Sequence, residues 1–252
     1  MKKSFLNNSN SMLTVMLQCK TPEAAISKIR NANCLGADAY GLQVETFMPE
    51  FQNPDTFKRL FAEMRNKPCY VTNYRYAYNQ KLTDDELADG IITLAESGAT
   101  LCDVMGDIFC KHPEELTDND EAIQKQMKLI EKLHSMGAEV LMSSHLYKFA
   151  PAERVLEIAF EQKRRGADII KIVTAADNME QQIENLRITN LLKQELGAPF
   201  LFLSGGVSTI HRRLGGHLGN CMTLCVYDHD ALSTASQPLL STMKTIRDSI
   251  DF

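Results

Sequence analysis

Short apolar runs alternate with amphipathic stretches along the whole chain. Within most runs the apolar residues are consecutive, as in parallel strands that are covered on both faces of a sheet. The runs predict eight strands, over residues 12–18, 37–45, 68–72, 100–105, 139–144, 168–173, 199–204 and 221–226. The stretches between them predict helices over residues 22–35, 54–64, 84–97, 118–136, 151–165, 177–196 and 237–250.

Residues at the helix ends support these boundaries. Thr21 followed by Pro22 is typical of a helix start, with threonine as N-cap and proline in the first turn. The run 83–86 (Thr-Asp-Asp-Glu) fits a capping box. Gly-Ala pairs after three of the segments, at residues 36–37, 137–138 and 166–167, indicate glycine at the position following a helix.

Eight strands in 252 residues leave about 31 residues for each strand and the connection after it, which is the length that parallel βαβ units need. A doubly wound sheet usually has fewer strands and a glycine fingerprint after the first one, whereas residues 16–20 contain no glycine. We therefore expect an α/β fold of the (β/α)8 TIM-barrel type, with residues 1–252 as a single domain. Residues 1–11 are expected to be a flexible start.

Composition narrows the functional class. The chain has 27 Lys and Arg against 32 Asp and Glu, so no basic surplus is present to bind nucleic acid. The apolar run at residues 12–17 is far too short for a membrane span, and the residues before it lack the pattern of a signal peptide. Seven scattered cysteines without a C-x-x-C pair favour a reducing cytoplasm. Together with the histidine spacing, they lead us to expect no structural metal.

Lys171 and His145 are the strongest candidates for chemistry. Lys171 lies within the apolar run Ile169–Val173, and His145 follows the preceding predicted strand. In a parallel barrel these two positions are neighbours at the catalytic end. A lysine facing an apolar interior is expected to lose its charge readily and so to attack a ketone as a neutral amine. A histidine beside it can carry protons near neutral pH.

Two segments resemble type I 3-dehydroquinate dehydratase. They are 143–145 (Ser-Ser-His) and 166–176, which contains Lys171. The likeness continues through Arg212, Gly205, Gly219 and Asn220 to the run 233–237. The resemblance implies that Lys171 forms the Schiff base, that His145 is the general acid/base, that Arg212 binds the substrate carboxylate, and that Ser233 and Gln237 belong to a lid.

The resemblance also implies an activity. A family member would be a hydro-lyase of the shikimate pathway for aromatic amino acid biosynthesis. It would convert 3-dehydroquinate, a cyclic 3-keto carboxylate, into 3-dehydroshikimate without a metal or organic cofactor. It would act in the cytoplasm, and a homodimer is possible.

The first half of the chain departs from the family pattern. Gly41 and Gln43 stand where the family has glutamate and arginine, and Arg75 comes one residue later than the family arginine. Met105 stands where the family has the glutamate that orients the histidine. Gln43 and Arg75 remain expected substrate contacts. Four of the seven tyrosines lie between residues 70 and 78, where we expect partly core and partly pocket wall.

These departures leave two alternatives open. Residues 204–206 (Ser-Gly-Gly) could bind a phosphate, which would fit a Schiff-base lyase or aldolase acting on another keto or phosphorylated sugar substrate; a tight turn explains the glycines equally well. Arg212 could serve a phosphate as well as a carboxylate. Because Met105 cannot orient His145, the chain could also be a catalytically weakened ligand-binding relative.

Overall fold

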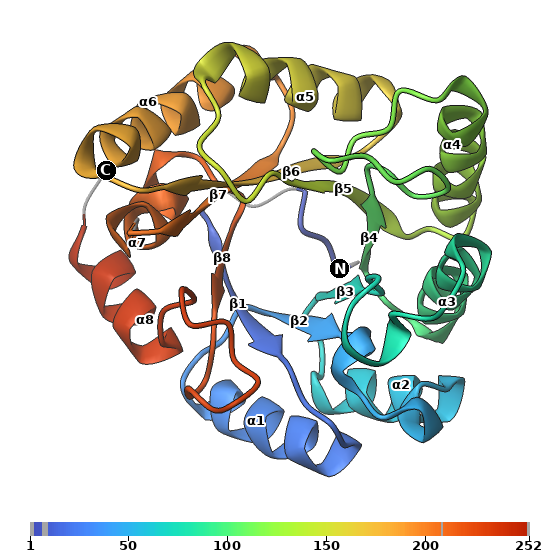
Figure 1. Cartoon of the computed structure of the whole chain (residues 1–252). Helices are drawn as coiled ribbons and strands as arrows, with labels where there is room; N and C mark the ends of the chain where they lie inside the picture. Colours follow the sequence, from blue (N-terminus) through green and yellow to red (C-terminus); the bar gives the residue numbers. More distant parts are fainter. Residues whose placement is uncertain (1–2, 7–9, 208, 251–252) are drawn as a thin grey trace.

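A ring of parallel strands is surrounded by helices (Figure 1). The computed structural model describes residues 3–6, 10–207 and 209–250. The strands are β1 (Met12–Leu17), β2 (Ala39–Gln43), β3 (Cys69–Thr72), β4 (Leu101–Met105), β5 (Glu139–His145), β6 (Ile169–Ala176), β7 (Phe200–Gly206) and β8 (Met222–Cys225). The helices are α1 (Pro22–Cys34), α2 (Pro54–Glu63), α3 (Asp84–Ser97), α4 (Asp120–Ser135), α5 (Ala152–Arg164), α6 (Met179–Glu195), α7 (Thr209–Leu218) and α8 (Leu240–Ser249).

The (β/α)8 barrel expected from the sequence is confirmed. Each of the eight predicted strands overlaps an observed one, and the N-cap at Thr21 and the capping box at Thr83 form as predicted. Helix α7 was not predicted, because its glycine pair is unfavourable inside a helix and favours a loop. Within the described part of the chain, no helix combines the length and apolar character that crossing a membrane requires.

Strands β6 and β7 extend further than the sequence predicts. They remain paired up to Ala175 with Gly205 and Ala176 with Gly206. Gly206 has φ +70°, and a Cβ at this position would collide with the carbonyl oxygen of Ala176. Gly206 is therefore explained by the close approach of two strands. Gly205 and Gly206 belong to the end of β7 rather than to a loop.

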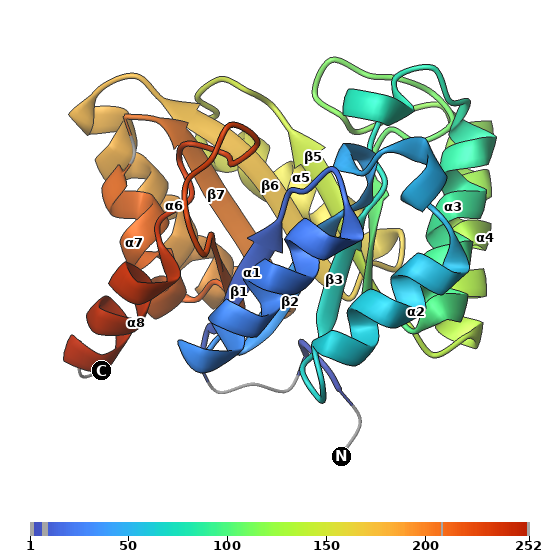
Figure 2. The same ribbon diagram turned by 90° about the horizontal axis from the view of Figure 1, so that it is seen from below.

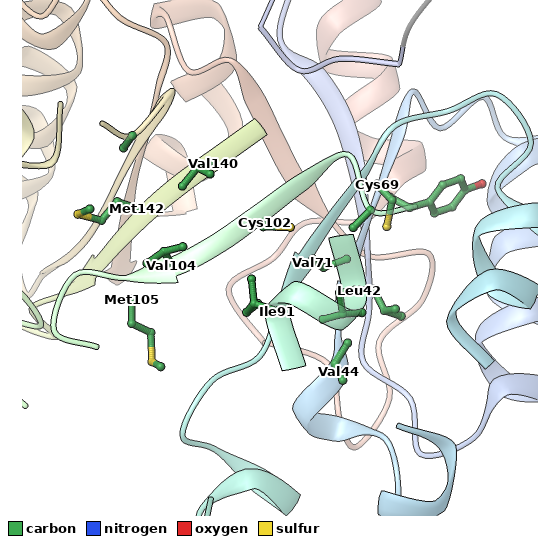
Figure 3. Packing of buried hydrophobic residues seen from close by; sticks show 14 of the residues in the cluster. Leu42, Val44, Cys69, Val71, Ile91, Cys102, Val104, Met105, Val140 and Met142 are labelled. Carbon is green, nitrogen blue, oxygen red and sulfur yellow. The ribbon is translucent and has the colours of Figure 1, made fainter. Parts of the chain in front are cut away.

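Two apolar clusters hold the barrel together. One fills the interior, with Leu101, Leu141, Ile169 and Leu201 near the N-terminal ends of their strands. The other lies between strands and helices, where Ile91 of α3 packs near the outward-facing side chains of neighbouring strands (Figure 3). Successive side chains of a strand point alternately into the barrel and toward the helices, which is why each strand contributes to both clusters. A polar side chain at an inward position therefore also faces the interior of the barrel.

The N-terminal segment corrects the expectation of a flexible start over residues 1–11. Phe5 is 1% exposed and belongs to the interior cluster. Its backbone N–H donates to Glu139 at 2.8 Å, and the Ser4 hydroxyl donates to the same carboxylate. Figure 2 shows this segment beneath the barrel, at the end opposite the long loops. Burial of an aromatic ring fixes the segment there; residues 1–2 and 7–9 lie outside the described residues.

The strands pair in the order β7-β6-β5-β4-β3-β2-β1-β8, so the barrel is closed between β7 and β8. A side chain contributes to this closure, which we call the seam. The Asn220 amide accepts from the N–H of Phe202 at 2.7 Å and donates to its carbonyl oxygen at 2.9 Å. Next to it, the N–H of Cys221 donates to Phe200 at 2.9 Å. Asn220 therefore replaces the backbone of a strand at this seam.

We predict that Asn220→Ala destabilises the fold. The substitution leaves two buried backbone groups of Phe202 without their partner, at a cost of about 2–4 kcal/mol in the free energy of unfolding. Urea denaturation of the two proteins measures this difference. The exposed Asn190, substituted by alanine, is the matched control and should change the free energy by less than about 0.5 kcal/mol. A cost for Asn220→Ala as small as that of the control would contradict the role of the seam.

Candidate active site

A cavity of about 730 Å³ opens at the C-terminal ends of the strands. This is the end at which TIM barrels carry their chemistry. Its lining includes six of the seven side chains predicted from the sequence, which are Lys171, His145, Arg212, Gln237, Arg75 and Gln43. Ser233 does not belong to the lining, although Thr234 and Ser236, which follow it in the chain, do.

Lys171 lies at the centre of the cavity floor and is 4% exposed. Its Nζ lies 2.6 Å from the hydroxyl oxygen of Tyr74, 2.9 Å from that of Tyr70 and 3.2 Å from Oδ2 of Asp103. Lys171 thus faces the barrel interior, where its side chain is surrounded by polar groups and is paired with a carboxylate. Both the lysine and the carboxylate occupy inward positions of their strands, so alternation along β4 and β6 brings them together.

The buried Asp103 carboxylate is fully hydrogen-bonded. Tyr70 and Tyr74 both donate their hydroxyls to Oδ2, and Ser143 donates to Oδ1 at 2.5 Å. Burial, together with the negative charge of Asp103, raises the pKa of both tyrosines well above the ordinary value. The two phenols therefore remain protonated and act as hydrogen-bond donors.

His145, the last residue of β5, is held by a carboxylate that sequence reasoning missed. Its Nδ1 lies 2.5 Å from Oε2 of Glu115, and its backbone N–H donates to the same oxygen at 3.2 Å. The ring also packs edge-on against Tyr74, with ring centroids 5.5 Å apart. Hence the expectation that His145 lacks an orienting carboxylate, drawn from Met105, is wrong.

Glu115 lies in the loop between β4 and α4 and is fixed by its surroundings. Its backbone has φ +48°, and its carbonyl oxygen accepts from Ser144 Oγ at 2.8 Å. A Cβ on Gly106 would collide with this carbonyl oxygen. The buried Arg165 donates to the carbonyl oxygens of Gly106 at 3.3 Å and Thr117 at 2.6 Å. These contacts anchor the loop that presents Glu115 to the histidine.

The two arginines of the cavity differ in their partners. Arg75 is bound to Asp84 at 2.6 Å and Asp107 at 2.8 Å. Burial opposes its charge, but these carboxylates outweigh burial and raise the pKa of Arg75. Arg212 donates from Nε to the carbonyl oxygen of Ser204, and no carboxylate among the described residues pairs with it. Burial lowers the pKa of Arg212 to about 10, so it is still a cation near neutral pH.

The predicted lid residues, Ser233 and Gln237, lie in the loop 228–237, which is attached to the first βα unit. Thr234 binds the Gln18 side chain through its hydroxyl at 2.7 Å and its N–H at 3.2 Å. The Ser233 hydroxyl instead donates to Asp230 at 2.9 Å, which shapes the loop. Gln237 is 6% exposed. Its amide oxygen and that of Gln43 are buried and have no hydrogen-bond partner among the described residues.

The side chains around the cavity suit organic chemistry. Among residues 3–6, 10–207 and 209–250, no cluster of three His, Cys, Asp or Glu side chains could hold a metal ion. An amine, an oriented imidazole and an unpaired guanidinium converge instead. This set can attack a carbonyl, move a proton and bind an anion.

Comparison with known proteins agrees with this chemistry. The family model for type I 3-dehydroquinase matches residues 13–251. The chain belongs to the type I 3-dehydroquinase family. It is 32% identical over 92 residues to 3-dehydroquinate dehydratase from Geobacillus thermodenitrificans, covering 36% of each chain. It is 27% identical over 135 residues to the enzyme from Listeria monocytogenes, covering 53% of this chain and 51% of the relative.

The alignments thus span between about one third and one half of the curated relatives' length. The crystal structure of 3-dehydroquinate dehydratase from Geobacillus kaustophilus superposes with a TM-score of 0.82 at 17% identity, over 98% of this chain and 94% of that one. Membership of the type I 3-dehydroquinase family confirms the resemblance and favours the dehydratase over the aldolase alternative.

Glu45 is fully buried and accepts hydrogen bonds from the Gln43 amide at 3.3 Å and from the Thr72 hydroxyl at 3.0 Å. Burial raises its pKa from the ordinary 4.5 to about 7. Between these pH values the folded chain holds a proton that the unfolded chain has lost, so Glu45 destabilises the fold increasingly as the pH rises.

We predict that Glu45→Gln removes this penalty. Relative to the wild type, the variant should gain about 3 kcal/mol in the free energy of unfolding between pH 4.5 and pH 7.5. Denaturant unfolding of both proteins across this range measures the change. The exposed Glu50, substituted by glutamine, is the control and should show no such trend. A constant difference between wild type and Glu45→Gln at all pH values would contradict the prediction.

Proposed function

We propose that this protein is a Schiff-base hydro-lyase that removes water from 3-dehydroquinate to give 3-dehydroshikimate. One observation carries the proposal. A buried lysine amine and a histidine oriented by a carboxylate line one cavity, in a chain of the type I 3-dehydroquinase family. The named relatives are 3-dehydroquinate dehydratases.

Lys171 and His145 divide the reaction between them. The Lys171 amine condenses with the ring ketone and expels water, which leaves a cationic iminium. The iminium withdraws electrons and so acidifies the neighbouring C–H. His145 removes that proton and returns it to the departing hydroxyl group, which leaves as water. Hydrolysis of the conjugated iminium then releases the product and restores the amine, so the iminium serves as the electron sink.

The remaining side chains suit a small keto carboxylate. Arg212, with no carboxylate partner among the described residues, would bind the substrate carboxylate. The buried amide oxygens of Gln43 and Gln237 would accept from substrate hydroxyls. Arg75 would contact the substrate at the rim of the cavity. Ser233 would fix the conformation of the lid through its hydrogen bond to Asp230. Such an enzyme would work in the cytoplasm without nucleic acid as a partner, and it could assemble as a homodimer.

We predict that Lys171 is trapped as a secondary amine when borohydride is added with 3-dehydroquinate. Mass spectrometry should place the adduct on the peptide that contains Lys171, and ultraviolet absorbance should show the conjugated enone forming. Lys171→Ala should lose both signals, while the exposed Lys128→Ala should keep them. Absence of turnover and of adduct in the wild type would exclude 3-dehydroquinate as the substrate.

We predict that Glu115→Gln lowers kcat by about 100-fold or more, because the amide cannot hold His145 as the carboxylate does. The effect should fall on kcat rather than on KM, since Glu115 acts through the histidine. Glu114→Gln is the matched control. Glu114 pairs with Arg154 at 2.7 Å and lies outside the cavity lining, so its kcat should stay near that of the wild type. Equal kcat values for the two variants would contradict the role of Glu115.

A further inference from the structure

The phenol of Tyr74 touches the atom that would react, and the proposed reaction gives it no task. Its hydroxyl oxygen lies 2.6 Å from Lys171 Nζ, closer to that nitrogen than the hydroxyl of Tyr70 or the carboxylate of Asp103. It also donates to Asp103 and lines the cavity. The inference drawn from this rests on the proposed function, because it concerns how Lys171 forms its Schiff base.

Formation of a Schiff base from an ammonium group requires several proton transfers at one place. The amine must first lose a proton, the attacked carbonyl oxygen must then gain one, and a further proton must convert that hydroxyl into water. The groups that can move these protons must lie within hydrogen-bond distance of the nitrogen and of the incoming oxygen. Asp103 lies 3.2 Å from Nζ but its side chain is fully buried, so it needs a carrier toward the cavity.

We propose that Tyr74 is a further catalytic residue, whose hydroxyl relays protons between Asp103 and the nitrogen and oxygen atoms of the carbinolamine at Lys171. This assigns the imine-forming steps to a tyrosine–aspartate pair and leaves His145 with the C–H proton and the departing hydroxyl. The ring of Tyr74 packs edge-on against His145, so both groups border the same space.

The protons balance in this scheme. The Lys171 ammonium gives one proton to Asp103 through Tyr74, and the free amine attacks the ketone carbon. The nitrogen of the adduct then gives a second proton to the former carbonyl oxygen, which makes the neutral carbinolamine. Asp103 returns its proton through Tyr74 to this hydroxyl, which leaves as water while the nitrogen lone pair forms the iminium. Asp103 ends as a carboxylate beside a cation, as it began.

Geometry distinguishes Tyr74 from Tyr70, which binds the same two partners. Both tyrosines line the cavity, but Tyr70 is fully buried on β3 and belongs to the interior cluster. Tyr74 lies beyond the end of β3, toward the open end of the barrel, and is only half-buried. Burial raises the pKa of Tyr74 well above its ordinary value, which keeps the phenol protonated between transfers.

The test measures condensation at Lys171 without the dehydration step. Acetylacetone forms a stable enaminone with a reactive lysine by loss of one water, and its absorbance reports the rate. Tyr74→Phe removes only the hydroxyl and should slow this rate by about 100-fold. Mass spectrometry should place the adduct on Lys171 in both proteins. The exposed Tyr78→Phe is the control and should retain the full rate. Tyr70→Phe, which removes a hydroxyl with the same partners, should be slowed clearly less than Tyr74→Phe.

The outcomes separate this inference from the proposed function. If Tyr74→Phe condenses as fast as the wild type, or if Tyr70→Phe is slowed equally, the relay through Tyr74 is overturned while the dehydratase stands. If the wild type fails to turn over 3-dehydroquinate but Tyr74→Phe still slows the acetylacetone reaction selectively, the relay stands and the substrate assignment falls. Absence of any adduct on Lys171 in the wild type overturns both.

Discussion

The buried pair of Lys171 and Asp103 is the constraint on which the rest of the site depends. A charge pair inside a protein is tolerated only when its remaining donors and acceptors are also bonded. Four adjacent strands meet this demand with one inward side chain each, Tyr70 from β3, Asp103 from β4, Ser143 from β5 and Lys171 from β6. The interior therefore has an apolar layer around Leu141 and Ile169 and a polar layer above it. Strand alternation produces both layers, and the boundary between them is the floor of the cavity.

Positions outside the strands are fixed by a different kind of interaction. Lys171 and His145 belong to strands, so the alternation of side chains along β6 and β5 determines the direction in which they point. Glu115 lies in a loop, where no strand geometry fixes its direction. The loop is held by hydrogen bonds from the buried Arg165 guanidinium and the Ser144 hydroxyl, and it packs into the space left by Gly106. A carboxylate on a loop can orient a histidine as well as one on a strand, provided that the loop is anchored inside the protein. This explains how Met105 can occupy a strand position without leaving His145 unsupported.

The sequence predicts what depends on periodicity and little of what depends on contacts between distant loops. Consecutive apolar residues gave the strands, and the strand register then placed Lys171 and His145 at one end of one barrel. Glu115 and Tyr74 lie in segments without periodicity, so nothing local indicates that they meet residues 30 and 97 positions away. The cluster of tyrosines at residues 70–78 was a usable signal, but its chemistry became visible only with Asp103 beside it. Phe5 was missed for the same reason, because one aromatic residue in a polar segment is buried by a partner far along the chain.

The two ends of the barrel are held with unequal strength, and the difference matches the needs of a Schiff-base site. At the closed end, Phe5 is buried and Asn220 binds backbone groups, which are contacts that cost much to break. At the open end, the lid is attached by Lys28 to Asp228 at 3.0 Å and Asp230 at 2.7 Å. These aspartates are partly exposed, and ion pairs of this kind typically contribute less than about 1 kcal/mol each. Breaking these ion pairs therefore costs little, so the part of the predicted lid that they hold can move while Thr234 stays bonded to Gln18 and the groups around Lys171 keep their positions. A covalent intermediate needs this combination, because substrate must enter and product must leave while the reacting nitrogen stays aligned with its proton donors.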